Sequence, residues 1–252
     1  MAKSIDSKVV FMTTSPRTPE KMIPEIDLLA KNFSGKKWNV QTQIQFMQLL
    51  RDENFFHGSG ENSPDFSARD RINRAPKSLG FITLAPAINL TPAGKQLVSA
   101  KRTEEIFLRQ LLKFQIPSPY HEPSEKAAKF FVKPYLEILR LIHKLGTLKF
   151  DELVIFGLQI TDYRKFDEIV RKIEDFRKQR ITTTKKYKEF KQSYFYNELQ
   201  EIYKNEIAAG KLSTRESATK TVKEFLNKKT RSMRDYADAC VRYLRATGVV
   251  LI

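Results

Sequence analysis

The stretch 79–92 constrains the fold more than any other, because it holds a helix stop, two short extended runs and a helix start in close succession. Gly80 is typical of the position after a helix, since glycine adopts the left-handed backbone conformation at little cost. Two apolar runs, Phe-Ile-Thr-Leu and Ile-Asn-Leu, flank a turn at Pro86 and predict a two-stranded ribbon. Thr91 followed by Pro92 predicts the N-cap and the first residue of another helix.

Two helices are expected before this stretch. Apolar residues within 42–50 fall mostly on one helical face. The next helix is expected to begin at Ser67, with Asp70 reaching back to the cap amide as in a capping box, and to be interrupted or restarted at Pro76. Helix, helix, ribbon and Thr-Pro-capped helix is the order of a winged helix. In that fold the ribbon is the wing, and the helix before it enters the major groove of DNA.

The second half of the chain is predicted to be more helical. The expected helices lie at 131–145, 162–180, 194–209, 215–227 and 232–245, with a further short one capped by Asp151. The apolar residues Val249–Ile252 predict the first strand of a second wing. Because an unpaired apolar edge strand is unstable and aggregation-prone, we expect the chain to have been cut short at this point.

A proline-rich segment divides the chain. Three prolines within 117–124 cannot sustain a helix and predict a boundary there. The predicted fold class is therefore mainly α with short β wings, built as two winged-helix (helix-turn-helix) subdomains. Residues 1–118 are expected to form the first DNA-recognition subdomain. Residues 119–252 are expected to form the second, more helical one, truncated at its wing.

The charge is strongly basic, with 45 Lys+Arg against 29 Asp+Glu and a formal net charge of +16. Such a balance is typical of a protein that binds a polyanion, most often nucleic acid, although a ribosome-associated or merely basic protein fits it too. Residues 171–234 hold 18 Lys+Arg and 8 Asp+Glu, a net of +10, whereas residues 1–100 hold 13 and 9, a net of +4. We therefore expect basic side chains of the region 171–234 to contact the phosphate backbone of DNA.

The composition also indicates in which cellular compartment the protein is expected. No apolar stretch approaches the roughly 18–20 residues of a membrane span, and the first residues lack the apolar segment of a secretory signal. The single cysteine, Cys240, cannot form an internal disulfide, which indicates a reducing compartment. We expect a soluble, cytoplasmic protein without membrane contact.

The sequence predicts no catalytic residue, metal site or cofactor in this chain. His57, His121 and His143 lie far apart and have no cysteine or paired carboxylate at metal-ligand spacing. The glycines at 58–60 lack the Lys-Ser/Thr that a phosphate-binding loop requires. A metal-dependent nuclease needs clustered carboxylates, and the acidic residues here are scattered.

Polar side chains on the helix before the wing are candidates for reading bases, because arginine pairs with guanine and asparagine with adenine in the major groove. Basic residues in the arm at 15–21, in the region 171–234 and on the last helix are candidates for phosphate, minor-groove or base contacts. The candidate DNA-binding residues are Arg17, Lys21, Ser67, Arg69, Asp70, Arg71, Asn73, Arg74, Lys77, Lys185, Lys186, Lys229, Arg231, Arg234 and Arg242.

Structural roles remain open for several of these candidates. Asp70 can act as a helix cap while the neighbouring arginines remain solvated charges. Arg242 can pair with Asp238 at helical spacing. The segment 15–21 can equally be a connector that leads into a helix.

Five segments carry a family resemblance: 15–21, 66–72, 90–95, 106–118 and 241–248. In this order they resemble the N-terminal recognition region of the AlwI-type restriction endonucleases, which include type IIS enzymes and strand-specific nicking relatives. The resemblance implies that two winged-helix subdomains read a short asymmetric duplex sequence. It also implies that a separate C-terminal, Mg²⁺-dependent nuclease domain cuts outside that sequence. The chain ends before that region, so the family's nuclease carboxylates have no counterparts here, and Mg²⁺ is expected only for the missing domain.

The predicted function is sequence-specific binding of double-stranded DNA, as the target-recognition region of a type IIS restriction or nicking endonuclease. The protein is expected to be monomeric and to come from a bacterial or archaeal cytoplasm. The alternative is a transcriptional regulator with tandem winged helices, which would usually dimerise and read a palindrome. A third possibility is a complete small nuclease.

Overall fold

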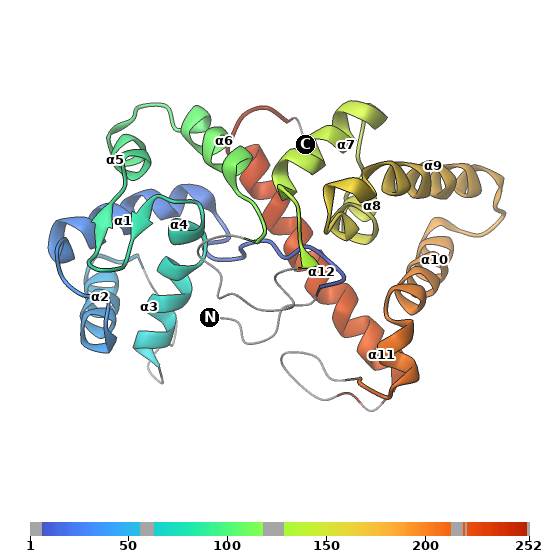
Figure 1. Cartoon of the computed structure of the whole chain (residues 1–252), viewed down its shortest axis with the longest axis horizontal. Coiled ribbons are helices and arrows are strands. Elements are labelled where there is room, and N and C mark those ends of the chain that lie inside the picture. Colours follow the sequence, from blue (N-terminus) through green and yellow to red (C-terminus); the bar gives the residue numbers. More distant parts are fainter. Residues whose placement is uncertain (1–6, 56–62, 118–128, 213–218, 220, 251–252) are drawn as a thin grey trace. The chain divides into compact units, whose positions relative to one another are not determined.

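The computed structural model describes residues 7–55, 63–117, 129–212, 219 and 221–250. Within these ranges the protein is mainly helical and contains a single two-stranded sheet (Figure 1). The chain divides into two compact units. The unit formed by Thr13–Phe114 and Ala239–Ile252 holds the sheet and is here named the ribbon unit. The unit formed by Met1–Met12 and Gln115–Asp238 is named the helical unit.

Neither unit is one continuous stretch of chain. The junction after Phe114 lies close to the expected division at 118–119, but the first twelve residues belong with the helical unit and the last fourteen with the ribbon unit. The long helix α12, Val222–Arg245, supplies residues to both. The assignment of the two halves as winged-helix subdomains stays a prediction.

The ribbon unit follows the predicted order of elements. Its elements are the 3₁₀ turn η1 (Pro19–Lys21), helices α1 (Met22–Phe33), α2 (Val40–Asp52), α3 (Pro64–Asn73) and α4 (Ala75–Ser78), strands β1 (Ile82–Thr83) and β2 (Asn89–Leu90), and helices α5 (Pro92–Ser99) and α6 (Glu104–Lys113). The strands are antiparallel, with Ile82 opposite Leu90 and Thr83 opposite Asn89. The short ribbon and the helix that follows it are confirmed.

The start of α3 differs from the expectation. The capping box at Ser67 and Asp70 is wrong, because the helix already begins at Pro64 and its N-cap is Ser63. Proline suits the first helical position, where its missing N–H has no partner to lose. The predicted break at Pro76 is confirmed, since α3 ends before it and α4 restarts with this proline in its first turn.

The turn into α5 explains why the helix packs closely on the ribbon. The Thr91 hydroxyl donates to the carbonyl of Gly80 over 2.6 Å, and its oxygen accepts from the amide of Gly94 over 3.0 Å. A Cβ placed on Gly94 would lie 2.0 Å from the carbonyl oxygen of Phe81. Only a glycine therefore allows the first turn of α5 to approach the ribbon backbone this closely. Gly80 has a φ of +74°, which confirms the predicted helix stop.

The core of the ribbon unit is aromatic and aliphatic. Phe81 and Phe107 meet edge to face, with ring centroids 5.8 Å apart. The end of α12 belongs to this core, since Tyr243 is fully buried and its hydroxyl donates to the carbonyl of Pro16 over 3.0 Å. Other fully buried members are Met22, Ile26, Leu29, Phe46, Met47, Leu50, Ile72 and Leu111.

The helical unit is built almost entirely from helices. Its elements are α7 (Pro134–Leu145), α8 (Phe150–Ile155), the 3₁₀ turns η4 (Gly157–Gln159) and η5 (Tyr163–Lys165), α9 (Phe166–Thr182), α10 (Tyr187–Ile202), α11 (Lys204–Ala208) and the first part of α12. Asp151 is not the cap of α8, because Lys149 occupies the N-cap position. The backbone amide of Lys149 donates a hydrogen bond to the carboxylate of Glu152 over 2.8 Å.

The last helices also differ from the prediction. The helices expected at 215–227 and 232–245 form one continuous helix from Val222, while 213–218 and 220 lie outside the described residues. The strand expected at 249–252 is not seen at 249–250, and 251–252 lie outside the described residues. A helix without Gly or Pro between Val222 and Arg245 has no local signal to stop it.

Aromatic side chains fill the core of the helical unit. Phe176 of α9 lies at the centre of a cluster with Phe156, Phe190 and Tyr194, with ring centroids between 5.0 and 5.6 Å from its own. Buried Glu152 is paired with Arg177 of α9, whose Nε lies 2.7 Å from Oε1. No helix in the described part of the chain is both long enough and apolar enough to cross a bilayer.

Candidate nucleic-acid interface

Helix α3 brings five of the predicted DNA-binding residues onto one element, and Arg74 directly follows it. Ala68 and Ile72 are buried and set the inner face of the helix. Phe66 and Arg69 are exposed, with Phe66 55% accessible. The predicted residues of α3 therefore divide between a face that packs against the protein and a face that is open to a ligand.

Arg71 has a structural partner. Its guanidinium donates to both carboxylate oxygens of Glu25 on α1, with Nε 3.2 Å from Oε2. The Glu25 side chain is 1% exposed, and that of Arg71 is 18% exposed. Burial raises the pKa of Glu25, and the charge and hydrogen bonds of Arg71 oppose that rise. The pair links α3 to α1 across buried surface, so Arg71 is held inside the unit.

Asn73 and Arg74 also contact the protein. The side-chain amide oxygen of Asn73 accepts a hydrogen bond from the indole N–H of Trp38 over 3.0 Å. Arg74 donates to the hydroxyl of Thr14 over 2.7 Å and pairs with Asp70 over 2.5 Å. These contacts orient the C-terminal end of α3 and leave its first two turns as the part best able to meet DNA.

Arg69 lies on the outer face of α3. Its side chain is 46% exposed and pairs with Asp65 one turn earlier over 3.4 Å. The guanidinium also lies 5.7 Å from the ring centroid of Phe66. An exposed ion pair of this kind contributes at most about 1 kcal/mol to stability. Arg69 can therefore give up its ion pair with Asp65 for a hydrogen bond to a base edge at little cost in free energy.

The remaining candidates of the ribbon unit lie outside α3, except for Ser67. Arg17 and Lys21 are exposed at the entry to α1, Lys77 is half-buried in α4, Ser67 is half-buried in α3, and Arg242 is exposed on α12.

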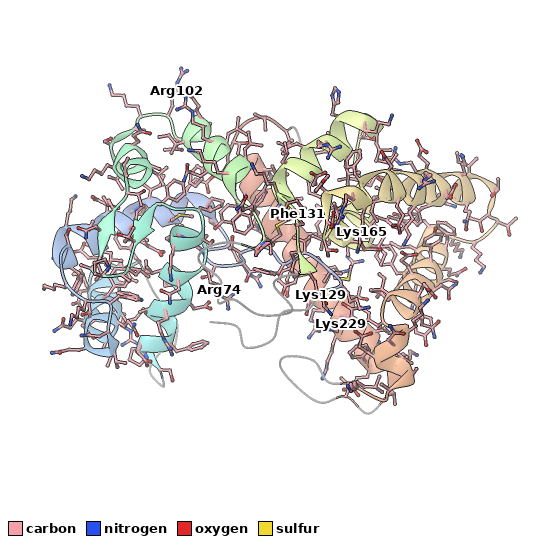
Figure 2. The ribbon with its side chains drawn as sticks, viewed as in Figure 1. Arg74, Arg102, Lys129, Phe131, Lys165 and Lys229 are labelled. Atoms are coloured by element: carbon pink, nitrogen blue, oxygen red, sulfur yellow. The ribbon has the colours of Figure 1, made fainter. Side chains whose placement is uncertain are left out.

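The helical unit carries its own basic surface around the start of α10. Lys185 and Lys186 are exposed there, as is Arg231 on α12. Arg234 is partly engaged, since it lies 3.3 Å from Asp151. Lys229, which is labelled in Figure 2, belongs to α12. Its Nζ lies 4.7 Å from the ring centroid of Tyr203.

Asp151 organises that surface. It accepts from Lys191 over 2.8 Å and from the Tyr187 hydroxyl over 3.0 Å. Burial and this carboxylate raise the pKa of Tyr187 to about 12, so the phenol stays protonated and donates its hydrogen bond. Asp151 thus holds Lys191 and Tyr187 in place beside the exposed lysines at 185–186.

Groups of three or more His, Cys, Asp or Glu side chains that could hold a metal ion are absent from the described part of the structure. His57 and His121 lie outside the described residues, and His143 is exposed on α7.

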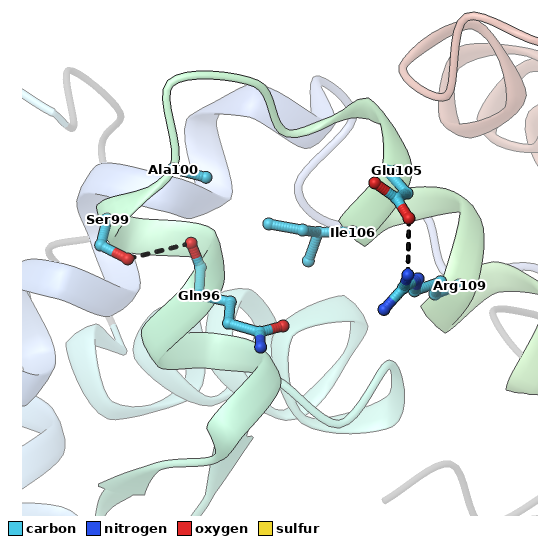
Figure 3. Close-up of a pocket in the computed structure, with 6 residues that line it drawn as sticks. All are labelled: Gln96, Ser99, Ala100, Glu105, Ile106 and Arg109. Atoms are coloured by element: carbon cyan, nitrogen blue, oxygen red, sulfur yellow. Dashed lines mark hydrogen bonds and ion pairs between the residues drawn. The ribbon is translucent and has the colours of Figure 1, made fainter.

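A hollow between α5 and α6 is too open to be a small-molecule site (Figure 3). It is lined by Gln96, Ser99, Ala100, Glu105, Ile106 and Arg109. Its two charged side chains, Glu105 and Arg109, are mostly exposed and pair with each other over 2.6 Å. Small-molecule sites usually bury most of their ligand, whereas this hollow is open and its charged side chains are exposed and paired with each other.

Comparison with models of known protein families shows to which family the chain belongs. The model of the AlwI restriction endonuclease family matches residues 77–252. The chain belongs to this family. The match begins within α4, so it includes the ribbon and α5 to α12, whereas the segments 15–21 and 66–72 precede it. A search of curated proteins finds no match. Membership of the AlwI family connects the chain with DNA restriction and makes DNA its expected partner.

Some residues important to this surface were not recognised in the sequence. The pairing of Arg71 with Glu25 spans 46 positions, and no local pattern indicates it. The pairing of Arg69 with Asp65 was detectable, because opposite charges four residues apart meet on a helix. The exposed rings of Phe131 and Tyr163 were also missed, although Lys-Phe-Phe-Val-Lys at 129–133 shows the alternation of an extended segment.

Proposed function

We propose that this chain binds double-stranded DNA sequence-specifically, as the target-recognition part of a type IIS restriction or nicking endonuclease. Family membership supports the connection to restriction. The observation that carries the recognition role is the exposed outer face of α3, directly before α4 and the β1–β2 ribbon. On this face Arg69 is 46% exposed and is held by the ion pair with Asp65 and by contact with the ring of Phe66. Helix followed by ribbon is the arrangement with which a winged helix reads the major groove.

Affinity and specificity are assigned to different residues. Arg69 of α3 is proposed to contact a base edge, where a bidentate arginine recognises guanine. The exposed lysines at 185–186 and Arg231 are proposed to contact phosphates and to set affinity and register. The nuclease step, with its Mg²⁺, is proposed to belong to a separate domain of the enzyme.

The test is selection from a random duplex library, with this chain at about physiological salt, where non-specific phosphate binding is weak. Enrichment of one short asymmetric motif is expected. Enrichment of a palindrome would instead support the tandem winged-helix regulator, because operator symmetry mirrors protein symmetry. No enrichment from a folded protein would contradict the recognition role.

Two further measurements address the remaining alternatives. Light scattering on the purified chain is expected to give the mass of a monomer, as an asymmetric site requires. Incubation with plasmid DNA and Mg²⁺ is expected to give neither nicks nor breaks, since the nuclease step is proposed to belong to a separate domain. Cleavage would show that the chain is a complete small nuclease.

A further inference from the structure

A surface of the helical unit combines exposed aromatic rings with lysines. Side chains from 129 to 134 alternate between exposed and buried, as on an extended segment whose one side packs on the core. Lys129, Phe131 and Lys133 are exposed, whereas Phe130 is 1% and Val132 is 5% exposed. The alternation directs Phe131 and Lys133 to the same side, and Lys129, in the turn directly before the extended residues, is exposed as well.

Backbone hydrogen bonds hold Phe131 beside Tyr163. The Phe131 amide donates to the carbonyl of Thr161 over 2.9 Å, and the Tyr163 amide donates to the carbonyl of Phe131 over 3.0 Å. The two ring centroids are 5.6 Å apart, with 52° between the ring planes. Phe131 is nevertheless 62% exposed and Tyr163 47% exposed. The rings are therefore held by the backbone next to each other and remain open to a ligand.

The charges around these rings are positive on balance. Arg164 is neutralised by Asp162, which it contacts through Nε over 2.9 Å and through its terminal nitrogen over 2.5 Å. Lys165 donates to the Thr161 hydroxyl over 2.9 Å. Lys129 and Lys133 have no acidic partner in the part of the chain that the structure describes. Figure 2 labels Lys129, Phe131 and Lys165 on this surface.

We infer that this surface, comprising Lys129, Phe131, Lys133, Tyr163 and Lys165 and here named the aromatic-lysine patch, binds single-stranded DNA. Every base has a π-face that stacks on an aromatic ring, and lysines nearby meet the phosphates. In a duplex the base faces are covered by their neighbours, so exposed rings gain little from it beyond contact with its edges. Unpaired nucleotides can stack their open base faces on the two rings while their phosphates contact the lysines.

The inference deepens the proposed function, since it rests on that function for the choice of DNA as the polyanion. It assigns the helical unit a ligand different from that of α3. Helix α3 would read intact duplex, whereas the aromatic-lysine patch would hold a strand where the duplex is locally open.

The experiment measures binding of a fluorescent twelve-nucleotide oligo(dT), of the same strand made abasic, and of a blunt duplex, by anisotropy with the full chain. Phe131→Leu and Tyr163→Leu keep an apolar side chain but remove the ring. Each is expected to weaken oligo(dT) binding by roughly 5–150-fold, the range for losing one stacked base, while abasic and duplex binding stay within about twofold. Tyr196→Leu, at an exposed ring on α10 outside the patch, is the matched control and is expected to change nothing.

Charge is tested separately. Lys129→Gln with Lys133→Gln is expected to lower the salt slope of oligo(dT) binding by about 1.4, at about 0.7 for each phosphate on a single strand. Circular dichroism melting checks that each variant is folded, as expected for substitutions at exposed side chains.

The inference is overturned if the folded wild type does not bind oligo(dT), or if the leucine variants bind it as tightly as the wild type. An equal loss on the abasic strand would also overturn it, because the rings would then not be stacking on bases. A failed duplex selection combined with ring-dependent oligo(dT) binding would refute the proposed function and leave the patch assignment standing.

Discussion

The Arg71 guanidinium contacts both carboxylate oxygens of Glu25, which lies almost fully buried on α1. Arg69, two residues earlier on the same helix, pairs with Asp65 one turn before it, and its own side chain is 46% exposed. The two arginines look equivalent in the sequence, yet one belongs to the interior of the ribbon unit and the other to its surface. This difference gives the first two predictions.

Arg71→Ala is expected to destabilise the ribbon unit by about 3–5 kcal/mol, because Glu25 would remain buried without its partner. Urea unfolding, followed by the fluorescence of the only tryptophan, Trp38, measures the change. Arg69→Ala is the matched control and should alter stability by less than about 1 kcal/mol. Equal losses in the two variants would contradict the structural role of Arg71.

Arg69→Ala is expected to relax recognition at one base pair of the selected site, at a cost of roughly 1–3 kcal/mol in binding free energy. Titrations with the cognate duplex and with single-base variants of it measure the effect. The reason is that a bidentate contact to guanine discriminates against the other bases. Uniform weakening on cognate and random DNA would refute a base contact by Arg69.

Lys186→Ala is expected to weaken binding to all duplexes by similar factors, because a phosphate contact carries no sequence information. The slope of log affinity against log salt should fall in magnitude by about 0.9 for the lost contact. Lys31→Ala is the control, since Lys31 is already paired with Asp27 on α1. A loss confined to the cognate site would contradict this assignment.

The pH dependence of stability is expected to report the burial of Glu25. Its pKa is raised in the folded protein, with burial as the main cause, so folding favours the protonated form relative to the unfolded chain. The contribution of Glu25 is therefore fully present below the unfolded pKa of 4.5 and is lost as the pH rises through the folded value.

The measurement compares the wild type with Glu25→Gln by urea unfolding at several pH values from 4 upward. The stability of the wild type relative to the variant should fall as the pH rises. A constant difference across this range would show that the Glu25 pKa is the same in the folded and unfolded states. A rise would show that Arg71 outweighs burial.

Gly94→Ala is expected to destabilise the ribbon unit by about 1–3 kcal/mol or more, although alanine is the better helix former. The added Cβ would lie 2.0 Å from the Phe81 carbonyl oxygen, which is backbone and cannot move aside without displacing the ribbon. Thermal unfolding measures the loss. Lys95→Ala, at the next and exposed position of α5, should change little. A stabilised Gly94→Ala protein would contradict the packing of α5 on the ribbon.

Local patterns alone determined much of the secondary structure. Gly80 ends a helix, and Thr91 with Pro92 starts one, because these residues act through their own dihedral preferences and through hydrogen bonds to near neighbours. The same kind of signal gave wrong helix starts at Ser67 and Asp151, because each residue lies inside a helix that begins earlier in the chain. No helix-breaking glycine or proline lies between Asn227 and Ser232, so one continuous helix forms where two were expected.

The excess of positive charge and the match to the AlwI family over residues 77–252 are properties of the amino-acid sequence alone. Only the tertiary structure decided which of the charges face outward. Arg71 is held by Glu25 from α1, and Phe131 is set beside Tyr163 by hydrogen bonds between segments about thirty residues apart. The physical reason is that caps and turns depend on neighbours along the chain. Burial, ion pairing and exposure depend on residues that meet only after the chain has folded.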